Sequence, residues 1–277
     1  MKPFLRILRP AFLSFALLLC FASAPACAQG FDQAHQAWDS LVRKHVVLVD
    51  GGKASQVRYA EFANDRAALK SYLDRLAAVT EAEFRAWTRP QQMAFLINAY
   101  NAYTVELILA NYPLKSIKDI GSDLFNNRWK KKFFKLLGQD GYLDRIEHEI
   151  LRKPGSYDEP RVHFAVNCAS IGCPMLREDA FVAGRLEAQL EEQAVRFLSD
   201  RSRNRVNAQG RLEVSKIFDW FKEDWMSGYQ GIRSREQYFG KYAKLLSDNP
   251  EQQKSVADGK APISFLDYDW TLNDVRR

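Results

Sequence analysis

The apolar segment from Met93 to Tyr112 is the feature that most constrains how this 277-residue chain can fold. Apolar side chains occupy almost every position of the segment, so a helix formed there has no polar face to turn toward solvent. Such a helix is stable only when other parts of the protein surround it. Pro90 fits the first turn of this helix, and Pro113 prevents its continuation. The sequence therefore predicts a buried central helix against which the rest of the chain packs.

Further helices are predicted on both sides of this segment. Phe31 to Lys44 has helical character, and Asn64 is suited to cap a helix that reaches Ala78. Later in the chain, apolar residues recur at helical spacing, which predicts that they face the core. These four residues are Leu186, Leu190, Ala194 and Phe197.

Short strands and turns complete the expected fold. Val57 to Phe62 is predicted as a strand, and the chain between Lys130 and Leu143 as a hairpin that turns at Gln139-Asp140-Gly141. A second hairpin is expected around Asn207 to Gly210, and a final strand from Ile263 to Trp270. The sequence contains neither an internal repeat nor a low-complexity linker. We therefore expect an α+β fold: a helix-rich single domain with a small, mostly antiparallel sheet and hairpins.

Residues 1–28 are predicted to be a cleaved signal peptide. Lys2, Arg6 and Arg9 precede an apolar stretch, and Ala26-Cys27-Ala28 is typical of a cleavage site after Ala28. A lipid anchor on Cys27 is the alternative interpretation. Cleavage leaves residues 29–277 (277 − 28 = 249 residues) as one globular domain, expected in the periplasm or secreted.

Charge and hydropathy restrict the possible partners. Subtracting the three cations of the signal peptide from the net charge of +6 leaves about +3, which is too weak to indicate nucleic-acid binding. No later segment has the length of apolar sequence that spans a bilayer. The expected partner is an unknown envelope substrate or protein.

The segment from His163 to Cys173 is the predicted functional site. Arg161 to Val166 is predicted as a strand that leads into a turn rich in small residues, where a side chain can be presented at a loop. Cys168 is placed there as a nucleophile, and a backbone nest beginning at Ala169 would lower its pKa and supply oxyanion donors. The general base must be His163 or His148, because no histidine follows Cys168. This order excludes an ordinary papain-like arrangement but is compatible with a permuted one.

His148 has possible support from neighbouring carboxylates. On a helix from Leu143 to about Arg152, Asp144 lies four residues before His148 and shares its face, and Glu147 lies on nearly the same side. The carboxylates would orient the imidazole and increase its basicity. The alternative is an ordinary pair on a solvated helix surface.

Asn98 and Asn101 lie one turn apart inside the apolar helix. Buried amides that lack partners are destabilising by about 1–3 kcal/mol each, so both side chains are expected to bond to something specific. Either they hold the Cys168 loop or orient a histidine, or they fix the backbone of a neighbouring segment.

Two other uses of the cysteines remain open. After removal of the signal peptide, Cys168 and Cys173 are the remaining cysteines, and in an oxidising compartment they would form a disulfide across a small loop. A zinc site built from His148, His163 and both cysteines is a weaker option, because one cluster without a second pair of cysteines is not specific. We expect no metal and no cofactor.

Four ordered segments resemble the domain-of-unknown-function 547 (DUF547) family. They are Phe95–Ala102, Asp144–His148, Arg161–Pro174 and Ser215–Trp220, and the resemblance extends from about residue 91 to about residue 225. The family occurs in bacteria and plants, and this chain is expected to be an exported bacterial member. The resemblance points to the same polar residues that the chemistry selects: Asn98, Asn101, Glu147, His148, Arg161, His163, Asn167, Cys168 and Cys173.

The sequence favours a thiol-dependent acyltransferase or hydrolase that acts on an envelope amide or peptide. Cys168 is the expected nucleophile, His163 or His148 the base, and Asp144, Glu147 or Asn98 the group that orients it. The upstream histidines give an order similar to that of permuted papain-like acyltransferases, which is an analogy at the level of fold. Contacts to the substrate are expected from Asn101, Arg161, Asn167 and Ser170. The alternative is a non-catalytic binding or scaffold domain with a structural Cys168–Cys173 disulfide.

Overall fold

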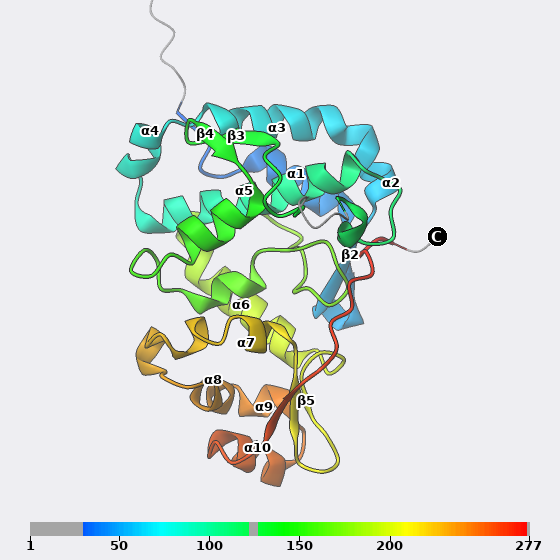
Figure 1. The fold of residues 1–277 in the computed structure, drawn as a ribbon, viewed down its shortest axis with the longest axis vertical. Helices are drawn as coiled ribbons and strands as arrows, with labels where there is room; N and C mark the ends of the chain where they lie inside the picture. The colour runs from blue at the N-terminus through cyan, green and yellow to red at the C-terminus, as the bar shows by residue number, and fades with distance from the viewer. Residues whose placement is uncertain (1–29, 122–126, 276–277) are drawn as a thin grey trace, which may run out of the picture. The chain divides into compact units, whose positions relative to one another are not determined.

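The computed structural model describes residues 30–121 and 127–275 (Figure 1). The predicted signal peptide lies outside the described residues. Within them, no helix combines the length and the apolar character needed to cross a bilayer. The fold is helix-rich α+β with small, mostly antiparallel sheets, as predicted.

The predicted central helix is α5, Arg89–Leu109. The side chain of Gln91 accepts a hydrogen bond from the Thr88 backbone N–H at 2.9 Å, and Pro90 lies in the first turn. Nearly all residues from Met93 to Leu109 are buried, which confirms that this helix is central. It ends three residues before the predicted end at Tyr112.

Helices from the N-terminal half pack around α5. They are α1 (Gln36–His45), α2 (Tyr59–Phe62), α3 (Arg66–Ala78) and α4 (Glu81–Ala86). Helix α1 begins at Gln36, five residues after the predicted start at Phe31. The predicted cap Asn64 lies in a short 3₁₀ turn, Ala63–Asp65, that leads into α3 without a side-chain cap.

A second group of buried residues is centred on the later helices. They are α6 (Leu186–Ser199), α7 (Ile217–Trp220), α8 (Arg235–Lys241), α9 (Ala243–Leu246) and α10 (Pro250–Ala257). The predicted apolar stripe of α6 is confirmed as core: its first half packs with α5 and its second half with α7 to α9. Figure 1 shows α6 and α7 between α5 and the α8–α10 group.

Within the described residues, the strands form three small sheets. β1 (Val46–Val49) pairs with β2 (Ala54–Val57), and β3 (Phe134–Leu136) pairs with β4 (Gln139–Gly141), both antiparallel. β5 (Arg205–Val206) pairs antiparallel with β6 (Leu212–Val214), which confirms the second predicted hairpin. β7 (Ile263–Phe265) pairs with β6 in parallel, and it is shorter than the predicted strand to Trp270.

One predicted strand and one predicted hairpin turn were wrong. The expected strand Val57–Phe62 is the end of β2 followed by helix α2, because an amphipathic turn buries Tyr59 and Phe62 on one side. In the first hairpin the turn lies at Leu137-Gly138, both at positive φ, and Asp140 pairs with Lys135 inside the ladder. Gly141 has a different role from the predicted one: a Cβ there would lie 2.1 Å from the Phe134 ring.

The predicted strand Arg161–Val166 is also incorrect. Pro160–Phe164 is a 3₁₀ helix, with proline in its first turn and the Glu159 carboxylate accepting the Arg161 backbone N–H at 3.1 Å. The polar residues Arg161 and His163 are buried together with Val162 and Phe164, so the alternation of polar and apolar residues does not separate an exposed face from a buried one, as it would in a half-buried strand. The segment nevertheless delivers Cys168 to a loop, as expected.

The burial of His35 predicts that the fold loses stability at acidic pH. Its ring is almost fully buried against Tyr72, and burial lowers its pKa from 6.5 to about 4. The unfolded chain therefore binds the proton more readily, so stability is lost as pH falls from about 6.5 to about 4. The shift of about 2.5 pH units corresponds to about 3 kcal/mol. Urea unfolding at pH 7 and pH 4 measures this effect. Between these pH values, His35→Phe should lose less free energy of unfolding than the unchanged chain. Parallel pH curves for the two proteins would contradict this assignment.

Candidate functional site

Asn101 holds the backbone that leads to Cys168. Its Nδ2 donates to the Ala165 carbonyl at 2.9 Å, and its Oδ1 accepts the Asn167 backbone N–H at 2.8 Å. Asn98, one turn earlier on α5, makes the same pair of bonds with Phe181 at 2.7 and 3.0 Å. The two buried amides therefore have different targets, and only Asn101 bonds to the segment that carries the cysteine.

Asn167 closes the loop from residue 167 to residue 174. Its Nδ2 donates to the Pro174 carbonyl and its Oδ1 accepts the Ala169 backbone N–H, at 2.8 and 2.9 Å. Ala169 has a φ of +59°, a left-handed conformation that is uncommon for a residue with a Cβ. The loop thus holds a strained residue directly after Cys168, and the surrounding bonds fix it there.

The Cys168 sulfur has three hydrogen-bonding neighbours. Its Sγ lies 2.7 Å from the Cys173 Sγ, 3.1 Å from the Ser170 Oγ and 3.2 Å from the Tyr268 hydroxyl. The Cys168 backbone N–H donates to the Cys173 Sγ at 2.9 Å. Both cysteines are free thiols in this structure.

These contacts make the two thiols chemically different. Burial alone would raise the pKa of Cys168, but the hydrogen bonds from Cys173, Ser170 and Tyr268 lower it below its usual value. Burial and the neighbouring Cys168 instead raise the pKa of Cys173 well above its usual value. Cys168 is therefore the cysteine that ionises first and the better nucleophile of the pair.

The predicted oxyanion donors near Ala169 are already in use. The Ala169 N–H bonds to Asn167, and the Cys168 N–H bonds to the Cys173 sulfur. No helix begins at Ala169 in this structure. The hydroxyl groups of Ser170 and Tyr268 lie within hydrogen-bond distance of the reacting sulfur and can donate to it.

Cys168 opens into a cavity of about 130 Å³, called here the thiol cavity. Five other predicted site residues line it: Asp144, Glu147, His148, His163 and Cys173. The remaining walls are mostly aromatic, and they are formed by Tyr100, Trp129, Trp220, Phe221, Tyr268 and Trp270. Side chains from separate segments between Tyr100 and Trp270 thus meet around one small, largely apolar space that contains the Cys168 thiol.

His163 is oriented by Asp224. The imidazole Nε2 lies 2.7 Å from the Asp224 carboxylate, and the ring stacks on Phe221 at 4.3 Å. Asp224 also accepts from Arg152 at 2.6 Å. Despite partial burial, these two partners lower the pKa of Asp224 to about 2, while burial lowers the pKa of His163. Asp224 could not be found from the sequence, because it lies outside every motif and 61 residues from His163.

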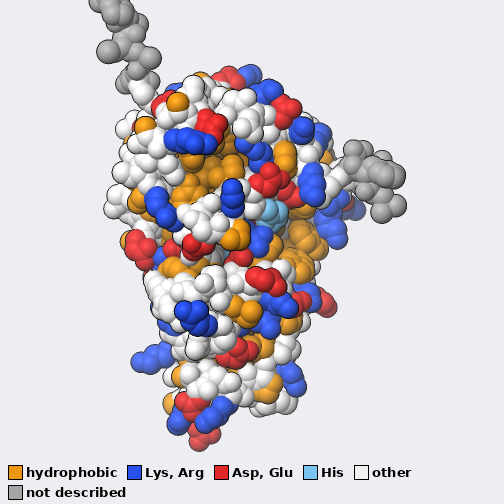
Figure 2. Space-filling view, turned by 60° about the vertical axis from the view of Figure 1, so that its left-hand side comes forward, with side chains coloured by type: hydrophobic (Ala, Val, Ile, Leu, Met, Phe, Trp, Pro, Cys, Tyr) orange, Lys and Arg blue, Asp and Glu red, His pale blue; other side chains and the backbone are white. Residues whose placement is uncertain are grey.

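His148 bonds to Arg152 instead of to a carboxylate. Arg152 donates to its Nδ1, so Nδ1 carries no proton and the neutral ring holds its proton on Nε2. Asp144, the predicted orienting group, lies 3.7 Å from that Nε2, beyond hydrogen-bond distance. Burial and Arg152 lower the pKa of His148. Figure 2 shows histidine atoms at the surface beside hydrophobic and charged side chains. The His148 side chain is 37% exposed, whereas His35, His45 and His163 are buried.

The segment that carries His148 is a π-helix, Arg145–Leu151. A wider turn of this kind is rare and is often found at functional sites. It buries Glu147, whose pKa is raised by burial although the Tyr100 hydroxyl bonds to the carboxylate. The π-helix thus turns Asp144, Glu147 and His148 toward the thiol cavity together.

Residues 84–198 match the family described as "Protein of unknown function, DUF547". This part of the chain belongs to the DUF547 family. No curated protein and no solved structure matches the chain.

The DUF547 match accounts for one part of the thiol cavity. It includes Cys168, both histidines and the π-helix, whereas Phe221, Asp224, Tyr268 and Trp270 lie beyond residue 198. Arg161 is inside the match but does not line the cavity. Its buried guanidinium is bound by three carboxylates, those of Glu159, Glu187 and Glu191.

The described residues of the DUF547 protein contain no group of three or more histidine, cysteine, aspartate or glutamate side chains arranged to hold a metal ion. The four residues of the zinc option have other partners. His163 bonds to Asp224, His148 to Arg152, and the two cysteines to each other and to hydroxyl groups. The geometry therefore favours a use of the sulfur as a thiol.

A close backbone contact keeps Tyr268 beside the thiol. The Gly172 N–H donates to the Asp269 carbonyl at 2.8 Å, and the Ile171 N–H donates to the Thr271 carbonyl at 2.8 Å. A Cβ on Gly172 would lie 2.9 Å from the Asp269 nitrogen, so glycine is needed for the two segments to approach. The C-terminal segment is thereby fixed against the Cys168 loop.

Tyr268→Phe should raise the pKa of the Cys168 thiol, because it removes one of the hydrogen bonds that stabilise the thiolate. The measurement is the pH dependence of Cys168 alkylation by iodoacetamide in the native protein. The midpoint should move upward. Tyr242→Phe is the control, because its hydroxyl bonds to Glu191 away from the sulfur. Equal midpoints in Tyr268→Phe and the unchanged protein would show that this hydroxyl does not act on the thiol.

Proposed function

We propose that this DUF547 protein is a thiol-dependent acyltransferase or hydrolase in which Cys168 is the nucleophile. One observation carries the proposal. The sulfur with the lowered pKa opens into a small aromatic cavity that also holds two neutral histidines, one of them oriented by a carboxylate. Nucleophile, proton-transfer groups and a water-poor space are the elements that acyl transfer needs.

In the proposed reaction, the Cys168 thiolate attacks the carbonyl carbon of an amide or ester. The proton lost by the thiol is carried by a histidine. A carbon–sulfur bond forms, the bond to the leaving nitrogen or oxygen breaks, and the leaving group takes this proton from the imidazolium. Water or an amine then attacks the thioester, gives its proton back to that histidine and releases the thiolate. His163 is the proposed proton carrier, because its Nε2 bonds to Asp224, whose carboxylate stabilises the imidazolium, and His148 is the second candidate.

Among the described residues, the hydrogen-bond partners of the Cys168 sulfur are Cys173, Ser170 and Tyr268. Neither histidine is one of them. The thiolate is therefore formed with the help of hydroxyl donors and does not require a direct thiol–imidazole pair. The histidines act on the leaving group and on the attacking water. This division of roles follows from the contacts around Cys168.

We further propose that the protein is an exported bacterial protein that acts in the periplasm or outside the cell. The proposal is supported by the basic, apolar and small-residue pattern of residues 1–28. An amide or peptide of the envelope is then the substrate class. Mass spectrometry of the N-terminus after expression tests the cleavage site, and an unprocessed Met1 in a soluble cell fraction would contradict export.

Cys168→Ser tests the proposed nucleophile. With para-nitrophenyl acetate as a general acyl donor, the unchanged protein should release nitrophenol in a burst equal to the protein concentration, and Cys168→Ser should show none. Cys173→Ser keeps a hydroxyl donor beside the sulfur and should retain the burst at a changed rate. An equal burst from Cys168→Ser would refute the proposal, provided that thermal unfolding shows both variants folded.

A second candidate is a non-catalytic binding or scaffold domain with a Cys168–Cys173 disulfide. The specific observation in its favour is the 2.7 Å separation of the two sulfur atoms. Thiol counting with and without reductant, on protein from the exported fraction, separates the two candidates. Two free thiols support the nucleophile, and a quantitative disulfide that also stabilises the fold supports the scaffold.

A further inference from the structure

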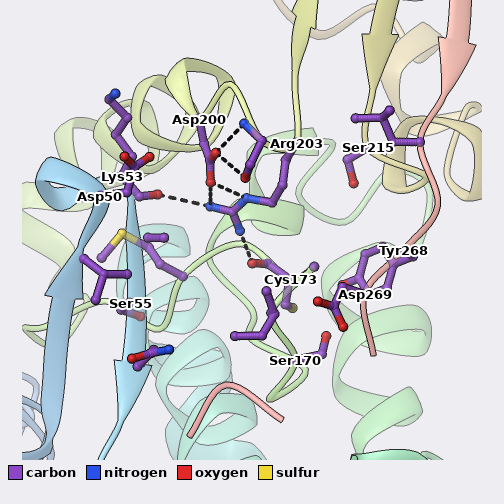
Figure 3. A pocket seen from close by; sticks show the side chains of 18 of the residues that line it. Asp50, Lys53, Ser55, Ser170, Cys173, Asp200, Arg203, Ser215, Tyr268 and Asp269 are labelled. Atoms are coloured by element: carbon purple, nitrogen blue, oxygen red, sulfur yellow. Dashed lines mark hydrogen bonds and ion pairs between the residues drawn. The ribbon is translucent and has the colours of Figure 1, made fainter. Parts of the chain in front are cut away.

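A second cavity, of about 780 Å³, adjoins the thiol cavity and shares Cys173 and Tyr268 with it. We call it the hairpin cavity, because β1, β2 and their turn form one wall. Figure 3 shows Asp50, Lys53 and Ser55 of the hairpin on one side and Tyr268 and Asp269 on the opposite side. Its volume is within the range of about 300–1,000 Å³ typical of ligand sites.

The hairpin cavity is in direct contact with the groups that control the thiol. All three side chains that bond to the Cys168 sulfur line it: Ser170, Cys173 and Tyr268. A molecule that fills this cavity therefore lies against the hydroxyl donors of the thiolate. The hairpin cavity is thus the space that adjoins Cys168 on the far side of these three side chains.

The floor of the cavity is a buried ion pair. Arg203 pairs with Asp200 at 2.6 Å, and it also donates to the carbonyls of Cys173 and Lys53. These bonds join the cysteine loop to the hairpin, as Figure 3 shows. The charges of Arg203 and Asp200 are therefore used internally and do not select a ligand.

The remaining charges of the lining are mainly negative. Among the described residues, Asp50, Asp267 and Asp269 have no ion-pair partner, and Lys53 is the lining cation that has none. The unpaired lining charge is thus negative, although the net charge of the whole chain is +6. A cavity with this charge favours a cationic ligand over an anionic one.

We infer that the hairpin cavity binds the extended part of the substrate, and that this part is a chain that carries primary ammonium groups. The inference rests on the proposed function, because it takes Cys168 as the reacting atom. An ammonium group near Asp267 and Asp269 would supply the cation that these carboxylates lack. An amine-bearing peptide is the substrate class that satisfies both the cavity and the thiol.

Calorimetric titration at low ionic strength tests this inference. The probes are tetralysine, tetraserine and tetraglutamate peptides with capped ends, and the protein is the full chain carrying Cys168→Ser. Tetralysine should bind measurably, and the other two peptides should not. Added salt should weaken the binding, because the attraction is between charges.

A matched pair of variants locates the binding. The double variant Asp267→Asn with Asp269→Asn should weaken tetralysine binding at least about fivefold, because it removes two unpaired carboxylates from the wall. The double variant Asp74→Asn with Glu81→Gln removes the same charge from surface helix pairs and should leave binding unchanged. Equal affinities of the two double variants, or equal binding of tetraserine and tetralysine, would overturn the inference.

The outcome is independent of the test of the nucleophile. Calorimetry on Cys168→Ser detects peptide binding whether or not Cys168 reacts. The ester burst detects the nucleophile whether or not the hairpin cavity prefers cationic peptides. Tetralysine should also slow alkylation of Cys168 in the unchanged chain, because it covers Ser170 and Tyr268. Binding without such protection would place the peptide elsewhere and refute the hairpin cavity as its site.

Discussion

Asn101→Leu is expected to destabilise the fold and to change the reactivity of Cys168 at the same time. The substitution leaves the Ala165 carbonyl and the Asn167 N–H buried without partners. Each lost partner is destabilising by about 1–3 kcal/mol, so the free energy of unfolding should fall by about 2–6 kcal/mol. Urea unfolding measures the first effect, and the alkylation rate of native Cys168 measures the second.

Asn98→Leu is the matched control for this prediction. It also removes two buried hydrogen bonds from α5, but both are made with Phe181, away from the cysteine loop. The loss of stability should be similar, whereas the alkylation rate of Cys168 should stay unchanged. If both variants change the alkylation rate equally, general loosening of the fold explains the result, and Asn101 has no specific role in placing the loop.

Arg203→Met is expected to lower the free energy of unfolding by about 3–5 kcal/mol, since it leaves a buried carboxylate without its charge partner. The side chains of Arg203 and Asp200 are 10% and 4% exposed. The substitution also frees the Cys173 carbonyl from the hairpin. Guanidinium unfolding gives the stability, and the alkylation rate of Cys168 reports the movement of the loop.

Arg205→Met controls for the loss of an arginine in the same region. Its ion pair with Glu213 is 2.8 Å long, but the arginine side chain is 39% exposed. An exposed pair contributes about 0–1 kcal/mol, so this variant should unfold close to the unchanged chain. A loss of stability in Arg203→Met no greater than in Arg205→Met would show that the buried pair does not hold the hairpin to the loop.

The parts of the fold that depend on hydrophobic pattern were predictable. The central helix α5 and the core face of α6 follow from the positions of their apolar residues, and both were confirmed. Local turns were less predictable, because one residue type can serve two purposes. Gly141 was interpreted as a turn residue, yet it is a glycine because the Phe134 ring lies against it.

The chemistry of the site was predictable where it is local in sequence. The loop with Cys168 and the two upstream histidines were identified from one segment each, and the structure brings them into one cavity. The partners that adjust their pKa values come from elsewhere. Asp224 lies 61 residues from His163, and Tyr268 lies 100 residues from Cys168, so only the folded chain reveals them.

The distance along the chain between Cys168 and Tyr268 has a consequence for biosynthesis. A ribosome adds about 5–20 residues per second, so the 100 residues between them take about 5–20 s to appear. During that interval the newly made cysteine lacks the tyrosine hydroxyl that helps to stabilise its thiolate. The unfinished polypeptide thus lacks one of the donors that lower the pKa of Cys168. The full set of donors around the sulfur is assembled only when the segment around Tyr268 docks against the Cys168 loop.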